Sequence, residues 1–224
     1  MKLVLLGTAD TMVQAPYDDR TWEIWACQTA ITYPACKRAD AIFELHDDSY
    51  WSDPAIIERI NAWGGPVWMQ RQVPQIPKSQ ALPLDEMIAS FGDAVGARYY
   101  TSTIALMLAF ALYRGEYDEI ALWGVHMETA EEWGKQRSAM EYWVGVANGR
   151  GVKVHVPRES SLCRSATVYG YDSESALMSE VRRLKDKMGA GLVNIKGELD
   201  NVVQKFHEQN GAIRALDYIS RKFS

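Results

Sequence analysis

The chain has 224 residues, of which 47% are hydrophobic, so it is long enough to bury a core of ordinary size. Its formal net charge of -5 and the lack of any basic block exclude a general nucleic-acid binder. No apolar run reaches the roughly 18 residues of a membrane span, and three scattered cysteines predict neither disulfides nor zinc. We therefore expect a protein of the reducing cytoplasm that has no membrane anchor, metal or cofactor.

The first predicted strand, Lys2–Leu6, is apolar and ends at Gly7. The loop that follows, 8–11, could bind a phosphate, and Thr8 is its first candidate. It has a single glycine and lacks the spacing of GxGxxG or of a Walker motif. An ordinary dinucleotide-binding or P-loop fold is therefore not supported.

Three more strands are predicted in the first third of the chain, at 22–27, 40–45 and 66–69, with a helix at 54–63 before the last. Gln28 follows the second strand and His46 follows the third. The connection 73–83 is too proline-rich for regular structure, and it could form a flap over the sheet edge.

The central stretch predicts a helix at 103–113 that is buried on most of its surface, then a strand at 120–125 buried on both faces. Thr101 and Ser102 lie just before the helix, where hydroxyls cap free amides and anions bind. His126 follows the strand. Because ligands of open α/β sheets bind beyond the carboxyl ends of the strands, these residues are candidates for a site.

A further helix at 141–148 and a final strand at 151–157 are predicted to complete the sheet domain. Arg137 could neutralise a phosphate, and Tyr142 could donate a hydrogen bond to it. A solvated helix face explains both residues equally well.

The pattern changes from about Asp172. Apolar residues first recur at steps of four and three as in a coiled-coil seam, at Leu177, Val181, Leu184 and Met188. After a predicted helix break at Gly189–Gly191, a second helix is expected to carry Leu192, Ile195, Leu199, Val202, Val203 and Phe206. A third short amphipathic stretch has Ile213, Leu216 and Ile219. Two interpretations stay open, a helical hairpin folded on the sheet domain or an element that joins subunits. We predict a nucleotide-binding domain over 1–171 and a helical extension over 172–224 that forms a homo-oligomer.

The order of elements over roughly 1–165 resembles a Rossmann-like group. This group contains the bacterial sialyltransferases of glycosyltransferase family 42, the motility-factor glycosyltransferases and the archaeal-type hydroxymethylpterin diphosphokinases. The shared features are the first strand with its glycine loop, the strand ending in Gln28, the Thr-Ser pair and the Gly-Val-x-Met end at 124–127. The chain also resembles small phage-encoded proteins of unassigned role.

The resemblance implies an α/β fold with a mainly parallel sheet, helices on both faces and a nucleotide at the sheet edge. It implies contacts from Thr8, Gln28, Thr101 and Ser102, with His126 beside the ligand. Asp10 lies in the same loop, where its carboxylate would repel phosphate. In the sialyltransferases, a histidine beyond the strand that corresponds to 120–125 is the general base. Residues 127–154 of this chain contain no histidine.

His46 is flanked by acidic residues, and a carboxylate could orient its imidazole for proton transfer. A strand-end histidine that only bonds a neighbouring loop is the structural alternative, and the same holds for His126. We predict a nucleotide- or nucleotide-sugar-binding protein, most simply a glycosyl- or related group transferase with one of these histidines as base. The alternatives are a protein that captures a nucleotide without turnover and an oligomeric structural or adaptor protein.

Overall fold

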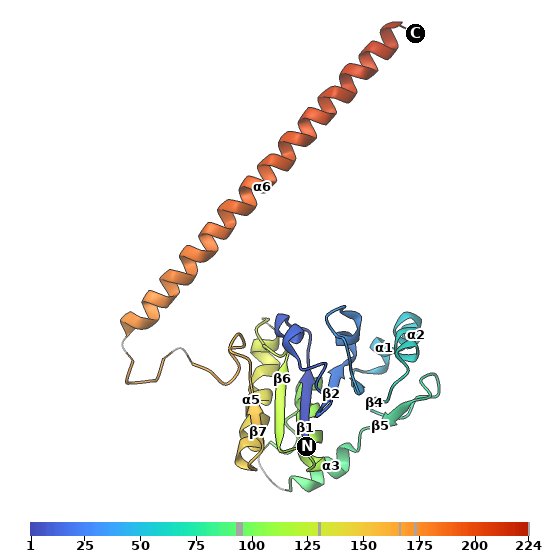
Figure 1. Ribbon diagram of the computed structural model, residues 1–224, viewed down its shortest axis with the longest axis vertical. Coiled ribbons are helices and arrows are strands. Elements are labelled where there is room, and N and C mark those ends of the chain that lie inside the picture. The colour runs from blue at the N-terminus through green and yellow to red at the C-terminus, as the bar shows by residue number, and fades with distance from the viewer. Residues whose placement is uncertain (93–95, 130, 166, 173, 224) are drawn as a thin grey trace. The chain divides into compact units, whose positions relative to one another are not determined.

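A seven-stranded parallel sheet in the order β5-β4-β3-β2-β1-β6-β7 forms the centre of the fold (Figure 1). The computed structural model describes residues 1–92, 96–129, 131–165, 167–172 and 174–223. The strands are β1 (Lys2–Leu6), β2 (Trp22–Cys27), β3 (Ala41–Glu44), β4 (Val67–Met69), β5 (Ser79–Ala81), β6 (Glu119–Trp123) and β7 (Lys153–His155). The predicted α/β fold with a mainly parallel sheet is confirmed.

Helices cover both faces of the sheet. The helices of the sheet domain are α1 (Asp48–Trp51), α2 (Pro54–Trp63), α3 (Leu84–Ser90), α4 (Thr103–Arg114) and α5 (Arg137–Gly149). A separate helix, α6 (Glu174–Phe223), follows in the C-terminal region. Short 3-10 turns η1 (Asp10–Gln14) and η2 (Gln28–Thr32) follow β1 and β2, and the π-helical turn η3 (Glu132–Gln136) precedes α5. Among the described residues, no helix is both long and apolar enough to cross a membrane.

Side chains of β1 alternate between two separate cores. Leu3 and Leu5 pack in the core that contains α4 and α5, whereas Val4 and Leu6 pack in the core that contains Ile60 of α2. All four side chains are fully buried. This explains why the strand is a continuous apolar run, as expected for a parallel strand covered on both faces.

The connection 73–83 was expected to lack regular structure, and this is wrong. Its residues 79–81 form the edge strand β5, parallel to β4. Pro77 and Pro83 flank this strand and do not interrupt it. The backbone amides of β5 therefore remain available for hydrogen bonds within the sheet. The helix α3, which follows directly, was not predicted.

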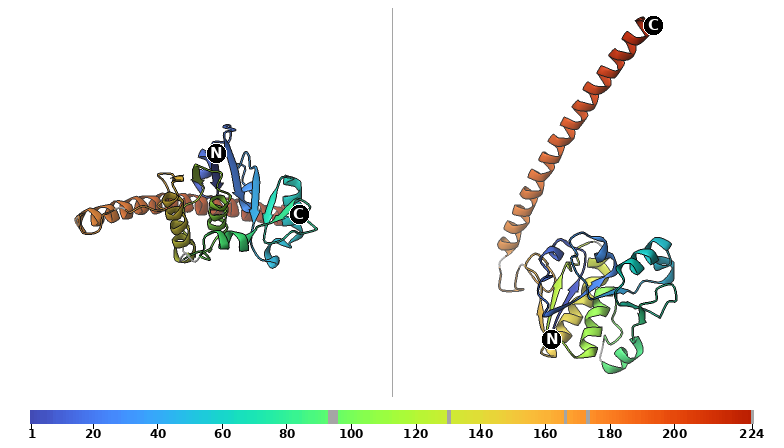
Figure 2. Two further views of the ribbon diagram at one scale, coloured as in Figure 1. Left: turned by 90° about the horizontal axis from the view of Figure 1, so that it is seen from below. Right: turned by 45° about the vertical axis from the view of Figure 1, so that its right-hand side comes forward.

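The C-terminal region is one continuous helix, α6, so the predicted break at Gly189–Gly191 and the helical hairpin are wrong (Figure 2). Glycine in a helix interior costs only about 1 kcal/mol, which neighbouring strong helix formers offset. The chain divides into two units, Met1–Arg164 and Ser165–Ser224. The side chains of Leu177 and Ile219 lie outside the described part.

The loops after β1 and β6 touch through two glycines. A Cβ on Gly7 would lie 2.3 Å from the Gly124 carbonyl oxygen, and a Cβ on Gly124 would lie 2.5 Å from the Gly7 carbonyl oxygen. Gly124 also has a φ of 71°, which ends β6 two residues before the predicted end of that strand. The amide of Ala9 donates to the Gly124 carbonyl at 3.0 Å, so each loop supports the other.

We expect Gly7→Ala to lower the free energy of unfolding by about 1–3 kcal/mol, because the new methyl group meets rigid backbone. Gly145 is the matched control, since it lies in α5 with open space around it. Gly145→Ala should raise the free energy of unfolding by up to about 1 kcal/mol. Urea denaturation of both variants measures the difference, and a Gly7→Ala protein of wild-type stability would contradict the close contact.

Candidate functional site

A cleft of about 850 Å³ opens at the carboxyl edge of the sheet. Its lining comes from residues 7–9, 100–104 and 124–129, together with Cys27, Thr29, Leu45, His46, Leu106, Glu131, Glu132 and Gln136. The cleft lies at the switch point of the topology, because the chain builds β2 to β5 on one side of β1 and β6 to β7 on the other. Open α/β sheets bind ligands at this place, and the volume is typical of small-molecule sites.

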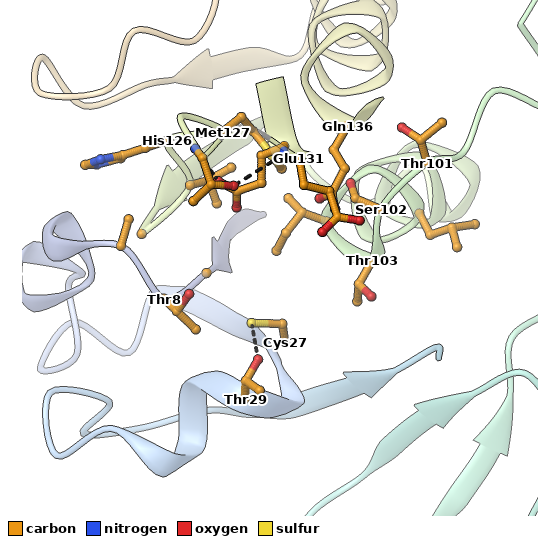
Figure 3. Close-up of a pocket in the computed structure, with 18 of the residues that line it drawn as sticks. Thr8, Cys27, Thr29, Thr101, Ser102, Thr103, His126, Met127, Glu131 and Gln136 are labelled. Atoms are coloured by element: carbon orange, nitrogen blue, oxygen red, sulfur yellow. Dashed lines mark hydrogen bonds between the residues drawn. The ribbon is translucent and has the colours of Figure 1, made fainter. Parts of the chain in front are cut away.

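Five of the predicted site residues line this cleft: Thr8, His46, Thr101, Ser102 and His126. Thr8, His46 and His126 follow strands of the parallel sheet, whereas Thr101 and Ser102 precede the helix α4. Segments that are far apart in the sequence thus meet at one edge of the sheet. Figure 3 shows Thr101 and His126 on opposite sides of the view, with Glu131 and Gln136 between them.

The start of α4 forms one wall. Ser102 is the N-cap residue, and its hydroxyl oxygen accepts a hydrogen bond from the Ala105 amide at 3.2 Å, which confirms the predicted capping. Thr101 and Thr103 flank it, so three hydroxyl groups surround the first turn (Figure 3). Amides of the first helical turn carry partial positive charge, so this wall favours an anionic group.

His46 is held by a buried carboxylate. Its Nδ1 lies 2.6 Å from Oε1 of Glu44, which also accepts the His46 amide at 3.0 Å. Glu44 is only 1% exposed, and within the described residues its Oε2 has no hydrogen-bond partner. The imidazole itself is half exposed and packs on the ring of Tyr50, with centroids 4.3 Å apart. Because Glu44 engages Nδ1, the geometry leaves Nε2 for a ligand.

His126 has a different partner. Its Nε2 lies 2.9 Å from the hydroxyl of Thr11, which accepts a hydrogen bond from the Gly124 amide. Thr11 is 2% exposed and therefore fixes the histidine ring to the contact between the two glycine loops. The nitrogen that faces Thr11 is already engaged, in contrast to Nε2 of His46.

The charge of the cleft is negative. Glu128, Glu131 and Glu132 line it, and the lining includes neither lysine nor arginine among the described residues. Two of these carboxylates also bind the backbone: Glu128 accepts from the Ser161 amide and Glu132 from the Thr129 amide. An anion in this cleft would depend on neutral donors and on the helix start. No cluster of residues within the described part could hold a metal ion.

Four other candidates lie outside the lining. The Arg137 guanidinium donates to the hydroxyl and carbonyl of Ser161 and pairs with Glu141 at 2.9 Å. Tyr142 packs edge-on against the rings of Tyr99 and Trp143. Asp10 begins η1 and is exposed.

Gln28 is the fourth of these candidates. It is 2% exposed, and neither polar atom of its amide has a hydrogen-bond partner in the described part of the chain. Its neighbours in the chain, Cys27 and Thr29, both line the cleft, with the Cys27 Sγ 3.6 Å from the Thr29 hydroxyl (Figure 3).

Tyr100 and Glu44 were not among the predicted site residues. Tyr100 lines the cleft and stacks on Trp143, with ring centroids 5.2 Å apart. Burial, together with the nearby Tyr142 phenol, raises the pKa of Tyr100 from 10.0 to about 12. The sequence did hold a signal for Glu44, because a carboxylate inside an apolar strand is unusual and needs a partner.

Comparison with solved structures identifies the architecture. A structure of the sialyltransferase CstII from Campylobacter jejuni, in complex with the substrate analogue cytidine-5'-monophosphate, matches with a TM-score of 0.50 and 13% identity. The match covers 80% of this chain and 98% of that chain. The chain has a sialyltransferase-like fold.

A mutant of the alpha-2,3/8-sialyltransferase CstII gives the same result, with a TM-score of 0.51, 12% identity and coverage of 80% and 99% of the two chains. No family model and no curated protein matches the sequence. The predicted resemblance to the fold of the bacterial sialyltransferases is thus confirmed. The resemblance to the motility-factor glycosyltransferases, the hydroxymethylpterin diphosphokinases and the small phage-encoded proteins stays a prediction.

The raised pKa of Tyr100 predicts a loss of stability at high pH. A pKa that is higher in the folded than in the unfolded chain contributes stability below pH 10, and this stability is lost as the pH rises toward 12. Tyr100→Phe should therefore flatten the fall of the free energy of unfolding over this range. Tyr169→Phe, which removes a 99% exposed phenol, is the control. If the free energy of unfolding falls equally steeply with pH in Tyr100→Phe and in wild type, the burial of this phenol is contradicted.

Proposed function

We propose that the cleft binds a donor in which a sugar or related group is linked to a nucleoside monophosphate, and that the protein transfers this group to an acceptor hydroxyl. The observation that carries the proposal is the pairing of a helix start rich in hydroxyls with a histidine held by a buried carboxylate, in one cleft. The sialyltransferase-like fold supports it, because CstII is described in complex with cytidine-5'-monophosphate.

The phosphate is proposed to lie against the first turn of α4. Thr101 and Ser102 provide hydroxyls there, and the backbone amides add the partial positive charge of a helix start. A single phosphate suits this wall better than a diphosphate, since three glutamates and no lysine or arginine line the described part of the cleft. Each added negative charge would meet repulsion without a cation to offset it.

His46 is proposed as the general base. The acceptor oxygen forms a bond to the anomeric carbon of the donor, and the bond from that carbon to the phosphate oxygen breaks. The nucleoside monophosphate leaves with the electron pair, and the acceptor proton moves to Nε2 of His46. Glu44 would hold Nδ1 and stabilise the positive charge that develops on the ring. His126 is the alternative base, but its Nε2 is engaged by Thr11.

Capture of a nucleotide without turnover is the second candidate function. It is favoured by the contact between Nε2 of His126 and the Thr11 hydroxyl, because a histidine engaged in this way supports the wall of the cleft and is not free to act as a base. Capture and transfer use the same binding wall and differ only in whether the donor is consumed.

We expect Thr101→Val to weaken the binding of cytidine-5'-monophosphate by about tenfold or more, because a hydrogen bond to a charged oxygen contributes about 1.5–3 kcal/mol. Thr21→Val is the matched control, since the Thr21 hydroxyl bonds Asp19 and lies outside the cleft lining. Calorimetry with a panel of nucleoside monophosphates measures the dissociation constants. The phosphate position is wrong if Thr101→Val binds as tightly as wild type.

Turnover should fall by about 100-fold or more in His46→Asn, with binding retained, because the base is removed and most of the shape is kept. Glu44→Gln should cause a smaller loss, since the amide can still accept from Nδ1 but carries no charge. His155→Asn is the control, because His155 pairs with Glu119 at the other end of the strands. Consumption of nucleoside-monophosphate sugars is measured beside binding for each variant.

Full turnover in His46→Asn would refute His46 as the base, and its loss in His126→Asn alone would assign that role to His126. Tight binding of a nucleotide with no consumption of any donor by the wild-type protein would favour capture. Failure to bind any nucleoside monophosphate would reject both functions.

A further inference from the structure

The helix α6 exposes an apolar stripe along most of its length. Its members are between 45% and 70% exposed: Val181, Leu184, Met188, Leu192, Ile195, Leu199, Val202, Phe206, Ile213 and Leu216. Apolar side chains in this number on one side of a single helix are unusual for a surface in water, and such patches mark interaction sites.

The stripe is narrow. Successive members are three or four residues apart, except for one step of seven from Phe206 to Ile213. A second step of four, from Met188 to Leu192, corrects the drift of the heptad pattern relative to the helix. At about 100° per residue, the members of the stripe from Val181 to Ile213 lie within an arc of about 80°. A stripe of this width is typical of a coiled-coil seam, whereas a helix on a globular core or a membrane surface needs a broader face.

The length of the stripe indicates another α6 as partner. The seam from Val181 to Leu216 is roughly 50 Å long at about 1.5 Å per residue. Apart from α6, the longest helix in the described part is α5, with 13 residues. That helix would cover only about 20 Å. A second copy of the chain offers a helix with the same length and the same spacing.

We propose that α6 helices from three or four copies of this chain associate in parallel and in register as a coiled coil. The number of strands follows from the seam residues. Leu192 and Leu199 occupy a positions, and Ile195 and Val202 occupy d positions. Leucine at a with a β-branched residue at d favours trimers and tetramers over dimers. Val203, at an e position and 45% exposed, widens the seam as a larger bundle requires.

The direction follows from Gln209, which takes the d position between Phe206 and Ile213. In a parallel bundle in register, each Gln209 meets its copies, and side-chain amides can bond to one another. An antiparallel pair with full overlap places Gln209 opposite Met188, which leaves a buried amide without a partner. An antiparallel pair centred on Gln209 would leave Val181 to Leu192 uncovered.

Charge at the edge of the seam agrees with this direction. Glu180 takes a g position and Lys185 the next e position, and these two positions face each other between parallel helices. In the single chain Glu180 pairs with Arg183, an exposed contact that a neighbouring lysine can share. Antiparallel helices would instead bring like positions, and thus like charges, together.

The molar mass of the full chain tests the assembly. Light scattering at micromolar concentration should give three or four copies for wild type, and Leu199→Asp should reduce the mass to one copy. Asn201→Asp adds the same carboxylate on the opposite side of α6 and should keep the wild-type mass. A wild-type monomer or dimer, or an unchanged mass for Leu199→Asp, would overturn the proposal. So would a monomer that binds vesicles of anionic lipid, which would assign the stripe to a membrane surface.

Disulfide trapping tests direction and register in the full chain. Because Cys163 is a free, exposed thiol, the test uses a Cys163→Ser background. Under mild oxidation, Gln209→Cys should link two copies in this background, while Asn201→Cys should not. Linkage of Gln209→Cys to Met188→Cys in a mixture, without linkage of Gln209→Cys to itself, would establish an antiparallel pair and overturn the proposal. This test does not depend on the proposed transferase activity.

Discussion

The contact between the loops after β1 and β6 is the constraint on which the site depends. Two backbones pass so closely at Gly7 and Gly124 that neither position has room for a side chain. The contact occurs where the strand order reverses, so the loops on either side diverge and leave a cleft. Thr11 joins this contact to His126 through one hydroxyl. A shift of either loop would therefore change both the floor of the cleft and the orientation of a histidine.

The second notable feature of the cleft is that its described lining has no lysine or arginine. The same lining has three carboxylates, so an anion there would depend on the start of α4 and on neutral donors. A buried carboxylate is costly unless it is paired, and Glu44 meets this cost with two hydrogen bonds from His46. The orientation of His46 and the burial of Glu44 thus depend on each other, because Glu44 holds the imidazole and His46 provides its hydrogen bonds.

The helix α6 differs from the sheet domain in where its apolar side chains lie. The sheet buries its strands within one chain, whereas α6 carries its apolar residues on an exposed stripe that a single chain leaves in water. Its length and narrow stripe suit association of identical helices. If the copies are parallel, all the sheet domains of an assembly would be attached at the same end of the bundle, since each precedes its own α6 in the chain.

The sequence by itself determined the strand runs, the cap at Ser102 and the parallel class, because apolar runs, capping residues and glycine stops are local signals. It also placed His46 and His126 after strands, which parallel pairing brings to one edge. It did not determine that β5 would add to the edge after Pro77, nor that α6 would continue through Gly189. The position of β5 depends on its pairing with β4, whereas α6 continues because neighbouring helix formers offset the cost of the glycine. The sequence also indicated that a flanking carboxylate could orient His46, since Glu44 is only two residues away. Only the tertiary structure decided that Thr11 holds His126 and that Arg137 is engaged by Ser161, because these contacts depend on which loops meet.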